Sequence, residues 1–315
     1  MVAGAQIAKR DSQEAIPKIP GRRAQWGRED PIAVDWKRYS AHLSAHEERE
    51  FAPFVHELIA RAFAVIRPLF LSGTRVHTKA DASPVTAADR KTEAALRRHI
   101  EKRYPTHGIV GEEYGVRQGE RYRWILDPID GTKAFISNCF LFGTLIALER
   151  DDGEGYRPVL GCIAHAAAGW ALVGHVRRTT LFGSDGIERR ARVRAARPLA
   201  QSTVLATSIP GLPQEDSDPS ALRVVQASAL ARTWGDCFGY FALATGGADA
   251  MLDPVLSYWD VAAVVPVVEG AGGRVSSWRG GDPLREPSLI ASSGALHEEI
   301  LALLRNASTD TAFQP

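Results

Sequence analysis

Four short apolar segments follow one another between residues 142 and 182, and they constrain the fold more than any other feature of this sequence. They read FGTLIALER, PVLGCIAHA, WALVGHV and TTLF, and the turns between them carry Gly, Asp or Pro. Strands joined by short turns pair in antiparallel fashion, whereas parallel strands need a long crossover connection, usually a helix. The run therefore predicts an antiparallel sheet rather than alternating βαβ units.

Helix patterns flank this segment and recur in the second half of the chain. Apolar residues repeat with the spacing of one helix face. Helices are predicted over residues 51–66 (in a pattern that begins at Ser44), 89–103, 258–270 and 296–304. Gly73 is expected to end the first helix, and Pro266 is expected to kink or end the third. Because helices and strands are grouped rather than alternating, the predicted fold class is α+β, in layers.

The two ends of the chain differ from the part between them. The first 35 or so residues have mixed charge, three prolines and no apolar periodicity. They lack the apolar centre of a signal peptide, and their acidic residues do not fit a mitochondrial transit peptide. We expect a mobile tail over residues 1–40, a single domain of two α/β halves over 41–307, and a second tail over 308–315.

Composition excludes several classes of function. The 315 residues carry a formal net charge of +1, and 45% are hydrophobic. A dedicated nucleic-acid or membrane-surface binder needs a concentrated basic face, and no apolar run approaches the roughly 20 residues of a membrane-spanning helix. Cys139, Cys162 and Cys237 are too scattered for a disulfide framework and are interpreted as small core residues. The sequence thus predicts a cytoplasmic protein with no nucleic-acid or membrane partner.

The segment DPIDGT, which follows a short apolar strand, carries two carboxylates in a turn. Pro128 restricts the backbone between Asp127 and Asp130, and Gly131 lets it bend tightly. Paired carboxylates without a nearby His or Cys suit Mg²⁺ or Mn²⁺ rather than Zn²⁺. Gly131 and Thr132 present N–H groups and a hydroxyl where a helix can begin, which is an arrangement that binds phosphate. The alternative is a plain turn, because Asp, Pro and Gly are the usual turn residues.

Three further acidic residues stand at element boundaries. Glu112 follows an apolar pair in IVGEE, where the alternative is a solvated loop. Asp260 and Asp89 stand at predicted helix starts, in WDVAA and TAAD, where the alternative is an ordinary N-cap.

Together, the segments SPVTAAD, VGEEY, WILDPIDGT and WDVAA, in this order and at these separations, resemble the inositol monophosphatase family of metal-dependent phosphatases. The resemblance extends from about His46 to Leu304. It implies a layered α-β-α-β-α sandwich, usually a homodimer, that hydrolyses a small phosphate monoester. It also implies a site with two or three Mg²⁺ ions, for which Mn²⁺ can substitute.

The resemblance assigns roles residue by residue. It implies metal ligation by Glu112, Asp127, the carbonyl of Ile129, Asp130 and Asp260. Asp89 and Thr132 would orient the attacking water and help to deprotonate it, with Glu112 also contributing to catalysis. Gly131 and Thr132 would hold the phosphate. Lys79 stands where the family carries a mobile loop, and it would help to complete the metal site.

Rival phosphatase chemistries do not fit these residues. A cysteine nucleophile with an arginine six residues later is absent, since Leu145, Ala168 and Leu243 occupy those positions. The aspartates of DPID are three apart, which excludes the D-x-D of haloacid-dehalogenase-type enzymes, and no Walker A sequence exists. Two metal ions can clamp the attacking and leaving oxygens of a phosphate ester, so no nucleophilic side chain is required.

The substrate is expected to be recognised by residues in the second half of the chain. The segments WGDCFGY and LDPVLSYWD are similar to the histidinol-phosphate phosphatase branch of the family. Asp236 and Asp253 are the predicted substrate-binding residues, because a carboxylate at the leaving group favours a cation such as histidinol. The alternative is that Asp236 pairs with Arg232 or another local base and never meets the substrate.

Two other functions remain open at this stage. One is a broader phosphatase acting on inositol, sugar or nucleotide phosphates. The other is a non-catalytic metal-binding relative, although every acidic residue that catalysis needs is in place.

Overall fold

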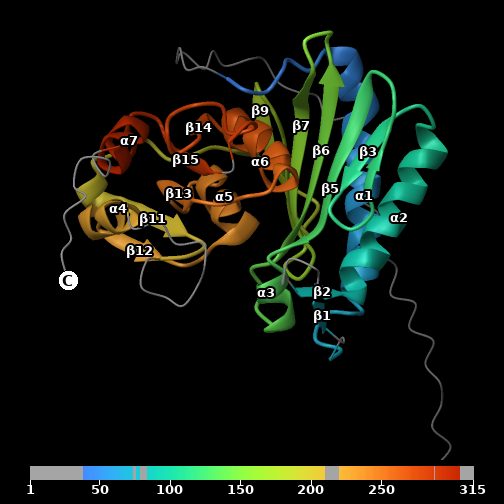
Figure 1. Cartoon of the computed structure of the whole chain (residues 1–315), viewed down its shortest axis with the longest axis horizontal. Helices are drawn as coiled ribbons and strands as arrows, with labels where there is room; N and C mark the ends of the chain where they lie inside the picture. Colours follow the sequence, from blue (N-terminus) through green and yellow to red (C-terminus); the bar gives the residue numbers. More distant parts are fainter. Residues whose placement is uncertain (1–37, 74–75, 79–83, 210–219, 287, 306–315) are drawn as a thin grey trace, which may run out of the picture.

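The computed structural model describes residues 38–73, 76–78, 84–209, 220–286 and 288–305. Within them the chain forms five layers (Figure 1). Helices α1 (Ala45–Ile66) and α2 (Ala87–Arg103) cover one face of a large sheet, α5 (Asp236–Ala244) and α6 (Tyr258–Gly270) lie between it and a smaller sheet, and α4 (Ala221–Ala227) and α7 (Leu296–Arg305) cover the far side. The predicted α-β-α-β-α sandwich is confirmed.

The large sheet has eight strands in the described part of the chain. Their spatial order is β10 (Glu188–Ala191), β9 (Arg178–Phe182), β8 (Trp170–His175), β7 (Tyr156–His165), β6 (Gly143–Asp151), β5 (Tyr122–Asp130), β3 (Gly108–Gly111) and β4 (Gly115–Arg117). The predicted antiparallel run is confirmed as β6 to β9. The sheet is not wholly antiparallel, however, because β3 pairs in parallel with β5.

The smaller sheet is mixed. Its described strands follow the order β12 (Leu230–Arg232), β11 (Thr203–Ala206), β13 (Ala250–Asp253), β15 (Leu289–Ser293) and β14 (Gly273–Ser276). The chain also forms a hairpin of β1 (Val76–Thr78) and β2 (Pro84–Thr86), a short helix α3 (Thr132–Ile136) and a 3₁₀ turn (Leu199–Gln201). In Figure 1 the hairpin and α3 lie together at one end of the large sheet.

Helix α1 begins after Ser44, where the sequence predicted, but it ends before the predicted Gly73. The Ser44 hydroxyl accepts from the Glu47 N–H at 3.2 Å, and the Glu47 carboxylate accepts from the Ser44 N–H at 2.8 Å, so the two residues form a capping box. The expected end at Gly73 was wrong, since the helix stops at Ile66. Pro68 has no N–H to continue the ladder.

The first described residues form a strap across the body. The N–H groups of Tyr39 and Ser40 donate to the two carboxylate oxygens of Glu269, at 2.7 and 3.1 Å. Ala41 donates to the carbonyl of Pro158 at 2.8 Å. Tyr39 and Ser40 are buried, so the predicted tail boundary at residue 40 falls inside a segment that packs on the domain.

Helix α6 packs unusually close to the large sheet. A Cβ on Gly161 of β7 would come within 2.1 Å of the Ala263 carbonyl, and one on Gly174 of β8 within 2.6 Å of the Val267 Cα. Only glycine leaves room for this approach. Pro266 was expected to kink α6 or mark its end, and it does not end the helix, since α6 continues to Gly270, buried from Val261 onward.

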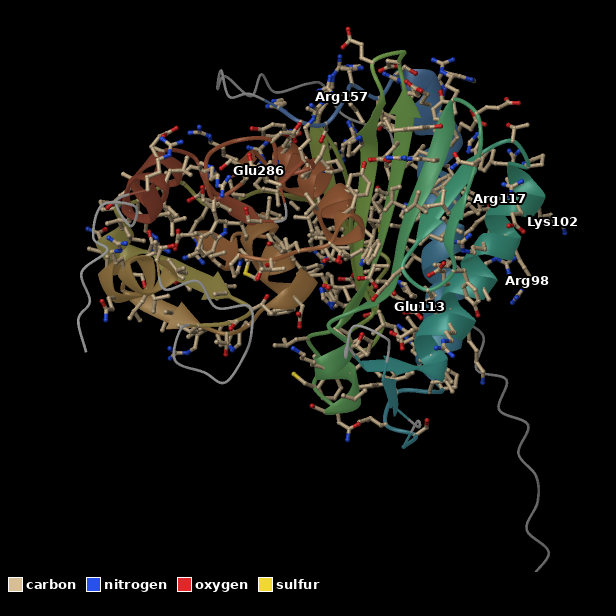
Figure 2. All side chains as sticks on the ribbon, in the orientation of Figure 1. Arg98, Lys102, Glu113, Arg117, Arg157 and Glu286 are labelled. Atoms are coloured by element: carbon tan, nitrogen blue, oxygen red, sulfur yellow. The ribbon has the colours of Figure 1, made fainter. Side chains whose placement is uncertain are left out.

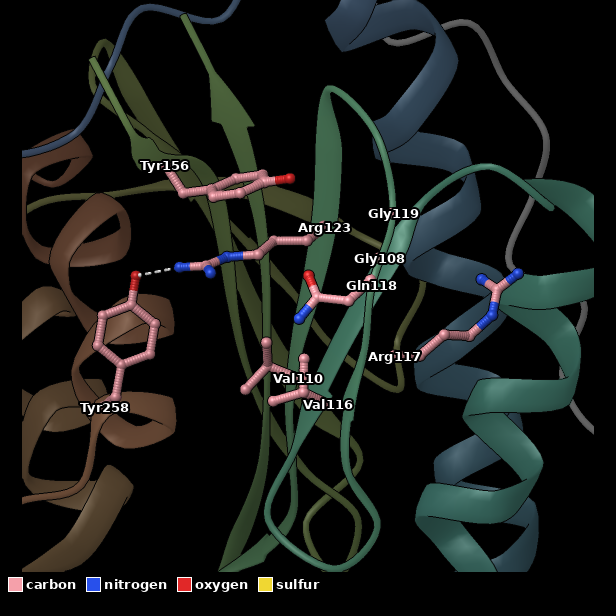
Figure 3. Close-up of a pocket in the computed structure, with 9 residues that line it drawn as sticks. All are labelled: Gly108, Val110, Val116, Arg117, Gln118, Gly119, Arg123, Tyr156 and Tyr258. Carbon is pink, nitrogen blue, oxygen red and sulfur yellow. Dashed lines mark hydrogen bonds between the residues drawn. The ribbon is translucent and has the colours of Figure 1, made fainter. Parts of the chain in front are cut away.

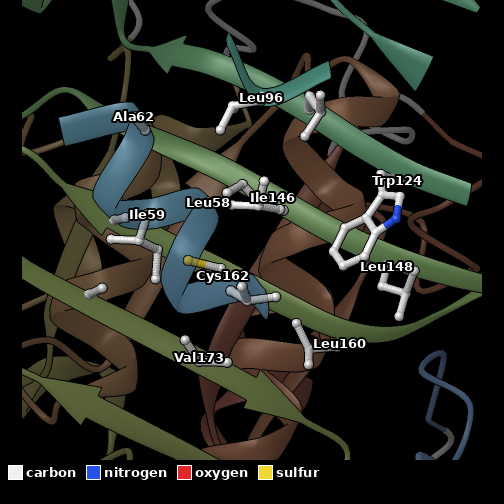
Figure 4. Close-up of a cluster of buried hydrophobic side chains, with 14 of the residues drawn as sticks. Leu58, Ile59, Ala62, Leu96, Trp124, Ile146, Leu148, Leu160, Cys162 and Val173 are labelled. Atoms are coloured by element: carbon white, nitrogen blue, oxygen red, sulfur yellow. The ribbon is translucent and has the colours of Figure 1, made fainter. Parts of the chain in front are cut away.

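Apolar packing follows the predicted patterns. Leu58, Ile59 and Ala62 of α1 and Leu96 of α2 pack on Trp124 and Ile146 of the large sheet (Figure 4). Cys162 lies in this cluster, as predicted, and Cys237 is buried between the sheets, but Cys139 is only half-buried. Arg98 and Lys102 of α2 face outward, as Figure 2 shows. Among the described helices, none is long and apolar enough to cross a membrane.

Candidate active site

Asp127 and Asp130 stand at the end of β5, where the pairing with β6 becomes irregular. The register shifts between these two residues, so both carboxylates leave the strand near the same point. The Asp127 carboxylate accepts from the Ile129 N–H at 3.0 Å, and the Thr144 hydroxyl donates to the Pro128 carbonyl at 2.8 Å. The segment is therefore a bulged strand end with fixed geometry rather than a simple turn.

Asp260 reaches the same place from α6. It is the third residue of the helix rather than the N-cap, and its carboxylate accepts from the N–H of the N-cap Ser257 at 2.8 Å. One carboxylate oxygen each from Asp127, Asp130 and Asp260 lies within 4.8 Å of the others. Two of these residues lie at the end of β5 and the third comes from the first turn of α6, so the group forms only when the two elements are packed together.

Glu112 adds a fourth carboxylate, from the end of β3. Its N–H donates to the Leu126 carbonyl at 3.2 Å, which holds it beside β5. Its charge is among the causes that raise the pKa values of Asp127 and Asp260, so it faces both. The predicted alternative of a solvated loop does not describe this half-buried residue.

Glu93 of α2 supports the Glu112 loop and was missed by sequence reasoning. It is fully buried and accepts from the N–H groups of Glu113 at 2.7 Å and Tyr114 at 3.2 Å. Arg97, one turn further along α2, pairs with it at 2.7 Å. The i, i+4 spacing of Glu93 and Arg97 was visible in the sequence, but that spacing is equally typical of an exposed helix face.

The electrostatics of the cluster favour a bound cation. Burial raises the pKa of Asp127 well above its usual range, and the charges of Glu112, Asp130 and Asp260 raise it further. Burial and the charges of Asp236 and Asp260 likewise raise the pKa of Asp130 well above its usual range. Burial raises the pKa of Asp260 to about 7. Crowded carboxylates of this kind are stabilised by a cation that all of them can bind. The all-oxygen donor set fits a hard divalent metal ion.

Asp89 and Thr132 lie together beside this cluster. The Thr132 hydroxyl is 3.4 Å from one carboxylate oxygen of Asp89 and 3.2 Å from the Ile129 carbonyl. The other Asp89 oxygen accepts from the N–H and the hydroxyl of Thr86, at 2.8 and 2.6 Å, because Asp89 is the third residue of α2 and Thr86 its N-cap. Burial raises the pKa of Asp89. The geometry leaves one oxygen of Asp89 directed at Thr132.

Gly131 links β5 to α3 in a left-handed conformation, with φ +80°. A Cβ there would lie 2.8 Å from a carboxylate oxygen of Asp236, so the two residues are in direct contact. Burial raises the pKa of Asp236, and the charge of Lys133 lowers it. Of the alternative partners, Arg232 is not the one found, since its guanidinium donates to the Ala231 carbonyl, and Lys133 is the local base whose charge acts on Asp236.

Asp253 stands further from the surface than expected of a substrate contact. It is 1% exposed, and its two oxygens accept from the Thr207 N–H at 3.3 Å and the Tyr240 hydroxyl at 2.6 Å. Burial raises its pKa to about 7. Contact between Asp253 and a substrate stays a prediction. Lys79 lies outside the described residues.

A second polar network anchors the start of α6 to the large sheet (Figure 3). The Arg123 guanidinium donates to Glu149 at 2.5 Å and to the Tyr258 hydroxyl at 3.0 Å, and it stacks on the Tyr156 ring with its carbon 4.1 Å from the centroid. The Tyr258 hydroxyl also donates to Glu149. Arg123, Tyr156 and Tyr258 border a cavity of about 340 Å³ whose lining includes none of the site carboxylates. The network fixes the turn of α6 that carries Asp260.

A family model described as the inositol monophosphatase family matches residues 47–309. The chain belongs to this family. It is 34% identical to a histidinol-phosphatase of Chlorobaculum parvum over 75% of this chain and 89% of that protein. It is 33% identical to an inositol-1-monophosphatase of Caulobacter vibrioides, over 79% of this chain and 96% of that protein.

The solved structures agree with the sequence comparison. An inositol monophosphatase from Zymomonas mobilis superposes with a TM-score of 0.71 at 34% identity, covering 84% of this chain and all of that one. The chain is therefore a phosphoric monoester hydrolase of a metal-dependent family, and its acidic cluster can hold the metal.

Proposed function

We propose that this member of the inositol monophosphatase family is a Mg²⁺-dependent histidinol-phosphate phosphatase. It would hydrolyse L-histidinol phosphate to L-histidinol and phosphate, a reaction of histidine biosynthesis. The observation that carries the substrate assignment is the contact of the Asp236 carboxylate with Gly131, which places a negative charge beside the predicted phosphate-binding turn. The names of three similar proteins, from Chlorobaculum parvum, Streptomyces coelicolor and Mycobacterium tuberculosis, support it.

The metal would be held by the residues whose carboxylates lie close together at the ends of β3 and β5 and the start of α6. These are Glu112, Asp127, Asp130 and Asp260, with the Ile129 carbonyl as a further oxygen donor. When bound, Mg²⁺ supplies positive charge that offsets the carboxylates and the phosphate, and it acts as a Lewis acid on the ester. Two or three ions, and Mn²⁺ as a substitute, stay predictions.

Thr132 and Asp89 would act on the attacking water. The Thr132 hydroxyl can donate to Asp89 and use its own lone pair to accept from the water, which orients the water toward the phosphorus. Asp89 is buried and its pKa is raised, so it is a stronger base than an exposed carboxylate and can take up the proton. Glu112, whose charge also acts on Asp89, would assist.

The N–H groups at Gly131 and Thr132 would hold the phosphate oxygens, and Asp236 would accept from the ammonium group of the leaving alcohol. A carboxylate with little solvent around it makes a strong hydrogen bond to a cation. A neutral polyol gains much less from the same contact.

The decisive experiment compares kcat/KM for L-histidinol phosphate and inositol 1-phosphate in Mg²⁺ buffer. We expect a clear preference for histidinol phosphate, with no turnover in EDTA. A preference for inositol 1-phosphate would support the second candidate, an inositol-1-monophosphatase like the Caulobacter relative. The family resemblance also predicts a homodimer, which analytical ultracentrifugation tests.

A further inference from the structure

Asp236 has a backbone conformation that its surroundings must maintain. Its φ is +50°, in the left-handed region that residues with a side chain rarely adopt. Such residues persist only where neighbouring groups hold them, and they are common at functional sites. Leu71 and Asn138 are the other non-glycine residues with positive φ in the described chain. Neither belongs to the carboxylate cluster.

The group that holds Asp236 is Thr207, at the end of β11. The Asp236 N–H donates to the Thr207 hydroxyl oxygen at 2.8 Å. The preceding residue also packs against Thr207, because a Cβ on Gly235 would come within 2.3 Å of the Thr207 Cα. The start of α5 is therefore fitted directly onto this threonine.

Thr207 is held in turn by Asp253. The Thr207 N–H donates to one Asp253 oxygen at 3.3 Å, and the Thr207 side chain lies close enough to this carboxylate to lower its pKa, against the larger effect of burial. The second oxygen accepts from the Tyr240 hydroxyl at 2.6 Å, and both Asp253 and Tyr240 are nearly fully buried. Asp253 thus fixes the backbone of Thr207, and the Thr207 hydroxyl oxygen is in place to accept from the Asp236 N–H.

The same turn also holds a carboxylate of the metal-binding cluster. The N–H of Cys237, the next residue, donates to Asp130. A shift of the Asp236 backbone would therefore move two groups at once: the Asp236 carboxylate, which touches Gly131, and the amide that orients Asp130.

We propose that Asp253, Thr207 and Tyr240 are positioning residues, a buried hydrogen-bonded relay that fixes the Asp236–Cys237 turn and through it the specificity carboxylate and the orientation of Asp130. Asp253 thus serves the substrate through Thr207 rather than by touching it. The part that concerns specificity rests on the proposed function, whereas the part that concerns Asp130 does not.

The test uses two substitutions of Thr207. Thr207→Val keeps the shape of the side chain and removes its hydroxyl, whereas Thr207→Ser keeps the hydroxyl and removes the methyl group. Tyr240→Phe removes the far end of the relay. Tyr122→Phe is the matched control, because the Tyr122 hydroxyl also donates to a carboxylate, that of Glu47, at 2.7 Å. Thermal unfolding of each variant shows that it is folded before any comparison is made.

Three readouts separate positioning from stability. They are hydrogen exchange of the Asp236 and Cys237 amides, Mn²⁺ binding to the substrate-free protein by calorimetry, and the ratio of kcat/KM for L-histidinol phosphate to that for glycerol 2-phosphate. We expect Thr207→Val to speed amide exchange, to weaken Mn²⁺ binding, and to lower the ratio by about 10-fold, within the range for one lost buried hydrogen bond. Tyr240→Phe should change the same quantities in the same direction, and Thr207→Ser and Tyr122→Phe should stay close to the parent protein.

The relay is refuted if Thr207→Val leaves amide exchange and Mn²⁺ binding unchanged, or if Thr207→Ser is as impaired as Thr207→Val. Equal effects in Tyr122→Phe would also refute it, since they would reflect a general loss of stability. If Thr207→Val does not fold, Tyr240→Phe decides the question by the same measurements. A parent protein with no preference for histidinol phosphate would overturn the proposed function alone, because exchange and metal binding do not depend on the substrate.

Discussion

Replacing Asp236 with Asn tests the substrate assignment with the least disturbance of the structure. The hydrogen bond that holds this residue comes from its backbone N–H, so Asn can keep the same turn while losing only the charge. The carboxylate is poorly solvated, as its raised pKa shows, and Lys133 is the cation whose charge acts on it. A cationic substrate therefore meets a charge that water screens only weakly.

The magnitude follows from the value of one charged hydrogen bond, about 1.5–3 kcal/mol. At tenfold per 1.36 kcal/mol, Asp236→Asn should lower kcat/KM for L-histidinol phosphate by roughly 10- to 150-fold. The same variant should hydrolyse glycerol 2-phosphate almost as well as the parent, because the metal ligands and the Gly131 turn are unchanged. Lys133→Met should increase the preference for L-histidinol phosphate over glycerol 2-phosphate, since it removes the positive charge that partly neutralises Asp236.

Steady-state phosphate release with both substrates provides the assay. Equal losses on the charged and the neutral substrate would refute the reasoning, because Asp236 would then be needed for structure alone. Unchanged kinetics on histidinol phosphate would refute it as well, since the carboxylate would not meet the leaving group.

Other predictions concern the cluster, the turn and the buried histidines. Asp130→Asn should abolish turnover and any Mg²⁺-induced rise in Tm, yet raise Tm in EDTA, because it removes one of several crowded negative charges; a lower Tm in EDTA would contradict this. Gly131→Ala should lose most activity, because the new Cβ would lie 2.8 Å from the Asp236 carboxylate. The control is Gly153→Ala, where φ is also positive (+95°) but nothing lies within 4 Å, so that only stability should fall. Equal activity of the two variants would contradict this prediction. Burial lowers the pKa of His107 to about 4, so the unfolded state binds a proton below about pH 6.5 that the folded state does not. Stability should fall as pH drops from 7 to 5, by about 2 kcal/mol from this residue, and His107→Gln should show a shallower dependence in urea unfolding; an equal slope in both proteins would contradict this.

The fold was largely predictable because the apolar spacing that marks each helix or strand in the sequence also marks the residues that each element buries. The antiparallel run β6 to β9 and the helices α2, α6 and α7 lie where apolar periodicity placed them. The errors arose where one residue's propensity was weighed without its surroundings. The end of α6 expected at Pro266 is not there, because that stretch of the helix is buried between two sheets, and packing outweighs one missing hydrogen bond.

The sequence selected acidic residues that the structure brings together, but not the contacts around them. Asp127, Asp130 and Asp260, which come from two separate motifs, form one cluster. It could not be foreseen that Asp253 would point at Thr207 and Tyr240, because those contacts depend on how β11, β13 and α5 pack. Glu93 was missed for the same reason, since only tertiary structure shows that it holds the Glu112 loop.

The strap at residues 38–41 has a consequence for the order of folding during synthesis. The Tyr39 N–H depends on Glu269, which is 230 residues later in the chain. As the ribosome extends the chain, the large sheet and its two covering helices can form while Tyr39 and Ser40 still lack their acceptor. Glu269 lies in the last turn of the same helix that brings Asp260 to the other carboxylates. The hydrogen bonds from Tyr39 and Ser40 and the carboxylate cluster therefore both wait for α6, near the end of synthesis, whereas Ala41 can already bind Pro158 of the large sheet.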